Sequence, residues 1–217
     1  MKKRTKLGFA GLLVAGVAAF GAAVTSTAVA SQSSTAKAKV GEKAPDFTLT
    51  DMKGETHTLS DLTKDGKTVV LEWFSPDCPY VVKHYANTEK STMNNLIKEF
   101  KDKDVVFLAI NSANADHPYA SKDRNMQRVS EWKIGHPILV DADGAVGKAY
   151  GARTTPHMYI IDTDGMLRYA GALDNDSSAR GIGDVNYVRQ GLTELLAGET
   201  LTVTETRAYG CSVKYAR

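Results

Sequence analysis

The chain has 217 residues, of which 42% are hydrophobic and 24% charged, and its 27 basic and 25 acidic side chains leave a formal net charge of +2. A chain of this length and composition is long enough for one globular domain with a substantial core. Its charges are nearly balanced and form no basic stripe, which excludes a nucleic-acid partner or an anionic membrane surface as the expected target.

The first thirty residues have the layout of a secretory signal peptide. Lys2, Lys3, Arg4 and Lys6 make a basic start, residues 7–24 are apolar, and Ala28-Val29-Ala30 is a small-x-small site. Cleavage is expected after Ala30. A retained membrane anchor is the alternative, but the many glycines and alanines make the apolar run only weakly hydrophobic. Cleavage removes four basic and no acidic residues, so the formal charge changes from +2 to −2. We expect a periplasmic or secreted protein with no stable membrane insertion after cleavage.

The remaining chain is divided by composition into a flexible lead-in at 31–39, one domain at 40–200 and a tail at 201–217. Hydrophobic periodicity and turn residues predict alternating strands and helices. In chain order we expect a hairpin with strands at 47–49 and 57–59, a buried strand at 68–74, a long helix at 79–101 bent near Asn87, a strand at 105–110, a helix at 121–132, a short strand at 138–140, a small helix at 145–150, a second hairpin at 157–161 and 167–173, and a last helix at 185–197.

This alternation indicates an α/β fold with a mixed central sheet flanked by helices on both faces. The first hairpin is an N-terminal extension, and the tail is expected to be irregular or weakly extended.

Cys78 stands between a predicted buried strand and a predicted helix. Pro79 follows it directly, and proline is favoured at the first helical position because the N–H there has no partner within the helix. Cys78 is therefore expected at the N-cap, where free N–H groups and the helix dipole favour thiolate over thiol. The pattern favours a reactive cysteine over an inert buried one.

Cys211, in the tail, is the other cysteine of the chain. In an exported protein two cysteines can form one structural disulfide, and this interpretation stays open. A tail cysteine can also condense with an oxidised Cys78 to form a disulfide during turnover. A static staple, an unpaired thiol and a resolving thiol are the three alternatives for Cys211.

Four segments carry a family resemblance: Val-Gly-Glu-Lys-Ala-Pro-Asp-Phe at 40–47, Cys-Pro-Tyr-Val at 78–81, Tyr-Gly-Ala-Arg-Thr-Thr-Pro at 150–156 and Gly-Cys-Ser-Val-Lys-Tyr at 210–215. Over residues 40–216 the chain resembles the peroxiredoxin-like branch of the AhpC/TSA (redoxin) family, in the thioredoxin-like superfamily. The resemblance implies a thioredoxin-like fold and reduction of a peroxide or a protein disulfide by Cys78. It also implies Cys211 as a resolving thiol, an external thiol reductant of thioredoxin type, and no cofactor.

The resemblance also assigns supporting residues. The Thr155–Pro156 bond is expected to be cis and to face the reactive cysteine, with the Thr155 backbone as a docking edge for a partner peptide or substrate. Ser75 occupies the hydroxyl position three residues before the cysteine. Thr155, Pro156, Ser75 and Tyr80 are the expected substrate-binding residues, and Tyr80 is expected to pack around the cysteine or in the core. Arg153 is expected to stabilise the thiolate or a bound peroxide.

Glu72 is a carboxyl on an otherwise apolar strand, six residues before Cys78. Desolvation there raises the pKa of a carboxyl and suits it to proton transfer near neutral pH. Its position also matches the buried acid of thioredoxin. The alternatives are an exposed residue at the strand end or one paired with a lysine.

Departures from related motifs keep other functions open. A CxxC motif of thioredoxin or DsbA type would need a cysteine where Val81 stands, and typical peroxiredoxins have a proline where Leu71 stands. A copper carrier of the Sco type would have its second cysteine at Val82 and would use Cys78 with a histidine. Thiol–disulfide exchange, copper binding and a redox-inactive binding module are the alternatives to peroxide reduction. The histidines are scattered and the acid pairs read as turns, so no metal site is expected.

Overall fold

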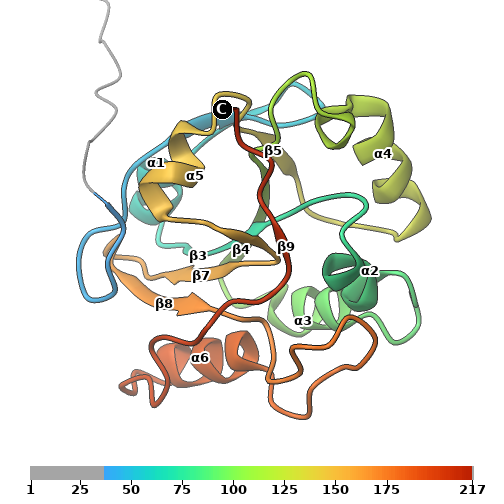
Figure 1. Cartoon of the computed structure of the whole chain (residues 1–217). Helices are drawn as coiled ribbons and strands as arrows, with labels where there is room; N and C mark the ends of the chain where they lie inside the picture. Colours follow the sequence, from blue (N-terminus) through green and yellow to red (C-terminus); the bar gives the residue numbers. More distant parts are fainter. Residues whose placement is uncertain (1–36, 217) are drawn as a thin grey trace, which may run out of the picture. The chain divides into compact units, whose positions relative to one another are not determined.

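The computed structural model describes residues 37–216, so the predicted leader lies outside the described part. A five-stranded sheet in the order β5-β4-β3-β7-β8 forms the centre of the molecule (Figure 1). The parallel strands are β3 (Thr68–Trp73), β4 (Val105–Asn111) and β5 (Ile138–Val140). The strands β7 (Met158–Ile161) and β8 (Leu167–Gly171) complete the sheet in antiparallel orientation. The predicted mixed sheet is confirmed.

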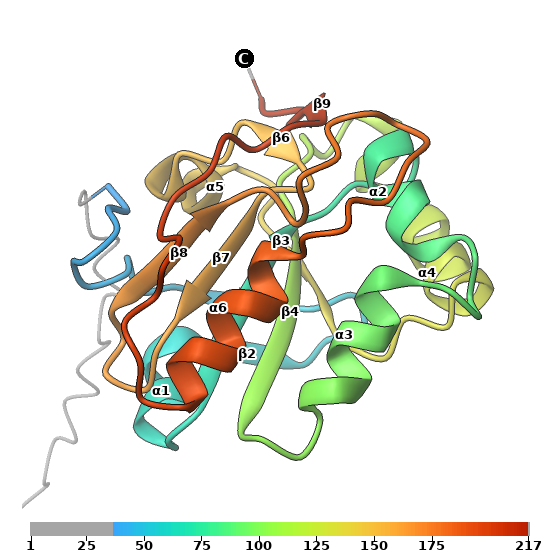
Figure 2. The same ribbon diagram turned by 90° about the horizontal axis from the view of Figure 1, so that it is seen from below.

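Helices cover both faces of this sheet (Figure 2). One face packs against α2 (Pro79–Tyr85), α3 (Thr92–Phe100), α4 (Lys122–Glu131) and α6 (Tyr187–Leu196). The other face packs against α1 (Leu59–Lys64) and α5 (Ala145–Tyr150). The remaining elements are the hairpin β1 (Thr48–Thr50) and β2 (Thr56–Thr58), the 3₁₀ turn η1 (Pro118–Ala120), and the two-residue strands β6 (Thr154–Thr155) and β9 (Cys211–Ser212).

Strand β3 lies in the middle of the sheet, and all six of its residues are buried. Successive side chains of a strand point to opposite faces. Val70 therefore joins the core under α2 and α3, while Leu71 and Trp73 join the core under α1 and α5. Burial on both faces explains why this segment is a nearly continuous apolar run, and it fixes the direction in which the chain enters the turn before α2.

The predicted elements are largely confirmed, with one correction. The single bent helix expected at 79–101 is wrong, because α2 ends at Tyr85 and α3 begins at Thr92. Ser91 separates the two helices: its Oγ accepts a hydrogen bond from the N–H of Asn94 at 3.1 Å and donates one to the carbonyl of His84 at 2.8 Å. A serine that caps the second helix in this way favours two separate helices over one bent helix.

Short elements absent from the prediction are α1, η1, β6 and β9. Helix α1 follows the first hairpin directly, and β9 agrees with the expectation of an irregular or weakly extended tail. Within residues 37–216, no helix combines the length and the apolar character that crossing a membrane requires.

Candidate active site

Cys78 lies at the N-terminus of α2, as its sequence context predicts. It is the N-cap residue with extended backbone angles, Pro79 is the first residue of the helix, and the Cys78 carbonyl accepts hydrogen bonds from the N–H groups of Val81 and Val82 at 2.9 and 2.8 Å. Its side chain is only 1% exposed. The cysteine is thus held on a rigid turn between β3 and α2 and is covered from solvent.

The Thr155–Pro156 peptide bond is cis, which confirms the expectation from the resemblance. The Cys78 thiol donates a hydrogen bond to the carbonyl oxygen of Thr155, with 2.9 Å between Sγ and O. The loop before β7 therefore touches the cysteine through its backbone. Thr155 is also buried, and none of the residues 37–216 forms a hydrogen bond with its hydroxyl.

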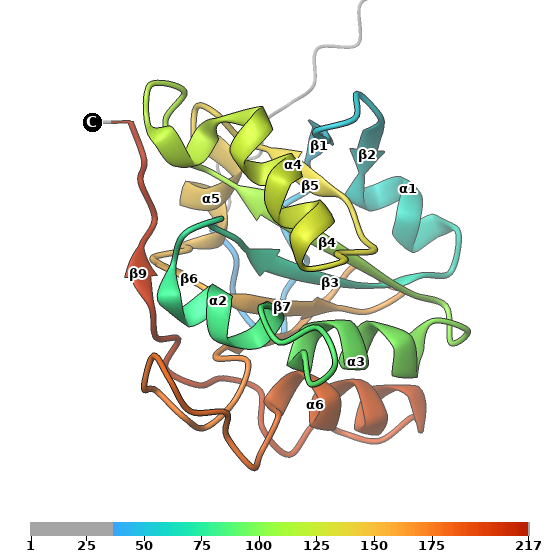
Figure 3. The same cartoon turned by 90° about the vertical axis from the view of Figure 1, so that its right-hand side faces the viewer.

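The C-terminal tail crosses this site. Strand β9 pairs antiparallel with β6, with Thr155 opposite Cys211 and Thr154 opposite Ser212 (Figure 3). The two cysteines, 133 positions apart in sequence, form a side-chain contact, and neither is in a disulfide. Burial first, and then the contact with Cys78, raise the pKa of Cys211 to about 12, whereas the charge of Lys214 acts to lower it. The structure brings the two thiols together in the reduced state.

We call residues 209–215 the strap, because this segment is anchored at both ends and crosses the site between them. At the first end the Tyr209 hydroxyl donates a hydrogen bond to Asp174, and the Lys83 ammonium lies 4.5 Å from the centre of the Tyr209 ring. At the other end the Tyr215 hydroxyl donates to the carbonyl of Ala152 at 2.8 Å. The strap is thus fixed to separate parts of the fold on both sides of Cys211.

Glycines make room for the strap at two places. Gly210 has a φ of +137°, and a Cβ there would overlap the Thr155 carbonyl. Gly144 and Gly147 form a slot for the Tyr215 ring, where added Cβ atoms would overlap the ring or its hydroxyl. Close backbone approach of this kind requires glycine.

Glu72 lies under α2 and is 2% exposed, so the prediction of a buried acid is confirmed. The Tyr85 hydroxyl donates a hydrogen bond to Glu72 Oε2 at 2.5 Å, and His136 Nε2 lies 3.4 Å from the same hydroxyl. Desolvation raises the pKa of Glu72 to about 8, although the Tyr85 hydrogen bond acts to lower it. Desolvation also lowers the pKa of His136 to about 4. At neutral pH Glu72 is therefore a protonated acid and His136 a neutral imidazole.

The turn before Cys78 is clamped by two arginines of α4 that sequence reasoning did not single out. Asp77 accepts hydrogen bonds from Arg124 and Arg128, and the Arg128 Nε also donates to the carbonyl of Pro76 at 2.9 Å. The Arg124 hydrogen bond is the largest cause that lowers the pKa of Asp77. No sequence motif pairs a residue at 77 with residues about fifty positions later, so only the fold reveals this clamp.

The other predicted residues have different surroundings. Ser75 is 7% exposed, its carbonyl lies 3.5 Å from the Cys78 nitrogen, and its hydroxyl has no hydrogen-bond partner among the residues that the structure describes. Tyr80 packs against Tyr209, with 6.0 Å between ring centres. Arg153 is exposed, and within residues 37–216 no side-chain hydrogen bond or ion pair involves it. Its carbonyl instead accepts a hydrogen bond from Val213 of the strap. A direct role for the Arg153 side chain stays a prediction.

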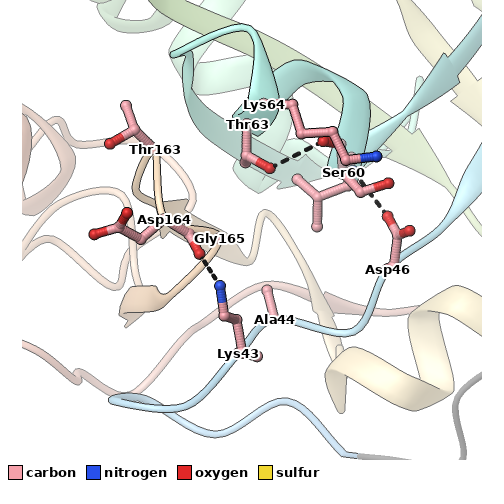
Figure 4. A pocket seen from close by; sticks show the side chains of 10 residues that line it. Lys43, Ala44, Asp46, Ser60, Thr63, Lys64, Thr163, Asp164 and Gly165 are labelled. Atoms are coloured by element: carbon pink, nitrogen blue, oxygen red, sulfur yellow. Dashed lines mark hydrogen bonds between the residues drawn. The ribbon is translucent and has the colours of Figure 1, made fainter.

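Two features away from Cys78 offer no comparable chemistry. A surface pocket between residues 43–46, α1 and the β7–β8 turn is lined mainly by polar side chains that bond to one another or to backbone, as between Lys43 and the Asp164 carbonyl (Figure 4). Asp51, Glu55 and His57 bring potential metal-ligand atoms within 4.8 Å of one another. The backbone N–H groups of Lys53 and Glu55 already bond to Asp51, which accounts for the turn of the first hairpin.

Comparison with known proteins agrees with this geometry. A sequence model of the redoxin family matches residues 39–186, a range that includes Cys78 but not Cys211. Thiol-disulfide oxidoreductase ResA of Bacillus thuringiensis is 30% identical over 131 residues, covering 60% of this chain and 68% of that protein. ResA of Geobacillus kaustophilus is 33% identical over 129 residues, covering 59% of this chain and 67% of that protein. These relatives support an oxidoreductase role.

Solved structures show the same fold. An uncharacterised conserved protein from Geobacillus kaustophilus has a TM-score of 0.72 at 31% identity, covering 82% of this chain and 93% of that one. Peroxidoxin BcpB from Mycobacterium tuberculosis, at 19% identity and a TM-score of 0.51 over 74% of this chain and 95% of that one, shares the fold. The sheet order, the cysteine at the head of α2 and the cis-proline beside it agree with the family match: the chain belongs to the redoxin family and has a thioredoxin-like fold.

Proposed function

We propose that this protein is a thiol-dependent peroxidase in which Cys78 and Cys211 form a dithiol–disulfide couple. Cys78 is the sulfur that reacts with the oxidant, and Cys211 is the resolving thiol. One observation carries the proposal: the pairing of β6 with β9 places Cys211 in contact with Cys78 across a cis-proline loop.

The reaction has two steps. The Cys78 thiolate attacks one oxygen of a peroxide, the O–O bond breaks, and Cys78 becomes a sulfenic acid while the other oxygen leaves with a proton as water or an alcohol. The Cys211 thiol then attacks the sulfenic sulfur, which forms the Cys78–Cys211 disulfide and releases water. Two electrons have passed from the two thiols to the peroxide, and an external thiol returns them by exchange.

Glu72 is suited to hold or deliver a proton during these steps. It is buried on the strand that leads to Cys78, and its pKa of about 8 lies close to neutral pH. A general acid or base works best when its pKa is near the working pH. The Tyr85 hydroxyl keeps the carboxyl oriented through the 2.5 Å hydrogen bond.

Thiol–disulfide exchange with a protein substrate is the second candidate, and the names of the ResA relatives favour it. Such exchange uses the same two thiols: Cys78 attacks a substrate disulfide, and Cys211 then displaces the reduced substrate. Val81 stands where a CxxC motif would have its second cysteine, so Cys211 would have to supply the second thiol in either reaction.

The test treats the reduced protein, without its leader, with one equivalent of hydrogen peroxide and maps both cysteines by mass spectrometry. The proposal expects consumption of peroxide and a Cys78–Cys211 disulfide. In the Cys211→Ser variant, the expected product is a sulfenic acid at Cys78 that a dimedone reagent captures. Unreacted peroxide and two free thiols would refute the peroxidase, and a disulfide that forms only with a protein or peptide disulfide would favour the second candidate.

We also propose that the protein works outside the cytoplasm, because residues 1–30 have the composition of a cleaved secretory leader. Sequencing the N-terminus of the protein recovered from the cell envelope or the medium tests this. A start at Ser31 supports export, and an intact Met1 in the cytoplasmic fraction contradicts it.

A further inference from the structure

The strap occupies the edge of β6 next to Cys78. Thr155 pairs with Cys211, and the Val213 N–H donates to the Arg153 carbonyl at 3.0 Å. Extended peptides bind to exposed strand edges through these same backbone groups. A substrate peptide that approached Cys78 along β6 would therefore need hydrogen-bonding groups that the protein's own tail already uses.

The strap competes strongly with a free peptide for the edge of β6, because it is part of the same chain and is anchored at both ends. Tyr209 binds at Asp174 and packs against Tyr80 of α2, and Tyr215 sits in the glycine slot of α5. A tethered segment acts at an effective concentration in the millimolar range for a short flexible link, and the anchors raise its occupancy further. A free peptide at lower concentration would rarely displace it.

A small molecule needs no backbone hydrogen bonds along the edge of β6. A narrow cavity beside Cys78 is lined by residues of the β3–α2 turn, the loop after β4 and the strap, namely Phe74, Ser75, Asn111, Ser112, Ala113, Tyr119, Thr155 and 212–214. Two of these residues touch Cys78 directly: the Ser75 carbonyl lies near its nitrogen and the Thr155 carbonyl near its sulfur. The hydroxyls of Ser75 and Thr155 are buried and have no hydrogen-bond partner in the described part of the chain, so both are free to bond to a small polar molecule.

We propose that the strap determines specificity: it leaves Cys78 open to small oxidants of the size of hydrogen peroxide and closes it to peptide and protein disulfides until the strap lifts from β6. The inference rests on the proposed function in taking Cys78 as the reacting sulfur. In the excluded reaction, Cys78 would attack one sulfur of a substrate disulfide, the S–S bond would break, and the other sulfur would leave as a thiolate and take up a proton. That attack needs the substrate backbone beside Thr155, where the strap lies.

The experiment compares two full-length proteins that both lack the resolving thiol. The first carries Cys211→Ser, which keeps the strap in place, and the second carries Cys211→Ser with Gly210→Ala, whose Cβ would overlap the Thr155 carbonyl. Each is mixed with hydrogen peroxide and, separately, with insulin, whose disulfides form a stable mixed disulfide with Cys78. The ratio of the insulin rate to the peroxide rate should rise by about tenfold or more when the strap is displaced.

A matched control tests whether backbone strain from replacing a glycine of positive φ is enough to change the ratio of the two rates. Gly198 also has a positive φ, of +74°, but a Cβ there would meet no atom of the described residues within 4 Å. Gly198→Ala in the Cys211→Ser background should leave the ratio unchanged. Tyr209→Ala in the same Cys211→Ser background removes one anchor of the strap. Like Gly210→Ala, it should raise the ratio of the insulin rate to the peroxide rate. Equal ratios in the Cys211→Ser, Gly210→Ala and Tyr209→Ala proteins would overturn the inference.

The outcomes also separate this inference from the proposed function. If peroxide oxidises Cys78 in none of the proteins, the peroxidase is refuted, while the insulin rates still report on the strap. If peroxide oxidises Cys78 but insulin reacts as fast with the strap in place as with the strap displaced, the peroxidase stands and the specificity role falls.

Discussion

Replacing Glu72 with glutamine should remove a large part of the pH dependence of stability. The carboxyl is fully buried, its Oε1 has no hydrogen-bond partner within residues 37–216, and burial raises its pKa to about 8 from an ordinary value of 4.5. The folded protein therefore holds a proton on Glu72 at pH values where the unfolded chain has released it. Between these two values the folded state binds more protons than the unfolded state, so stability falls as the pH rises.

The size of the effect follows from the shift. Each pH unit in this interval costs about 1.4 kcal/mol of unfolding free energy, and the slope halves as the pH reaches the folded-state pKa. From pH 6 to pH 8 the loss is about 2 kcal/mol. Buried histidines such as His136, whose pKa is lowered to about 4, contribute in the opposite sense as the pH falls below their unfolded value. They contribute equally to both proteins, so the difference between wild type and Glu72→Gln isolates the carboxyl.

The assay is urea unfolding of both reduced proteins at pH 6, 7 and 8. We expect the wild type to lose about 2 kcal/mol relative to Glu72→Gln across this range. Any constant cost of burying the amide cancels in that comparison. Parallel pH profiles for the two proteins would show that Glu72 ionises near its ordinary range, and the proton-transfer role assigned to it would lose its basis.

Three further predictions follow from the same contacts. In the disulfide form, prepared with diamide, glutathione should attack the partly exposed Cys211 rather than the buried Cys78, and peptide mapping of the trapped adduct should favour Cys211 by about ten to one; a majority on Cys78 would contradict it. Arg128→Ala should lower the unfolding free energy by about 2 kcal/mol because Asp77 and the Pro76 carbonyl lose charged donors. Arg189→Ala breaks the exposed ion pair with Glu99 and should lower the unfolding free energy by about 0.5 kcal/mol or less. Equal losses for Arg128→Ala and Arg189→Ala would refute the special role of the clamp. Gly147→Ala should displace the Tyr215 ring and speed trypsin cleavage after Lys214, whereas Gly135→Ala, with open space around it, should not; unchanged cleavage in both would rule out the slot as an anchor.

The parts of the site that could be predicted from sequence are those with local signals. An apolar strand, a cysteine and a proline in succession define the position of Cys78 because strand burial and helix capping act over a few residues. Glu72 stood out for the same reason, as the one carboxyl in an apolar run. The boundary between α2 and α3 was missed because the capping role of Ser91 is visible only once the preceding helix is known to stop.

The strap and the arginine clamp could not be predicted, since they join segments that are far apart in the chain. Nothing near Cys211 indicates that its strand pairs with Thr155, and nothing near Asp77 indicates Arg124 or Arg128. Gly210 is visible in the sequence, but its need for a bare Cα appears only when the Thr155 carbonyl lies against it. Such contacts depend on the completed fold.

The ribosome makes Cys211 after the elements that hold Cys78, because Cys211 lies in the strap and Cys78 in the turn between β3 and α2. The sheet and the turn that hold Cys78 are complete by residue 196, where α6 ends, so a newly made chain passes through a stage with a single thiol at its site. A premature stop codon or a protease cut at the start of the strap would remove Cys211 and return the protein to that one-thiol stage.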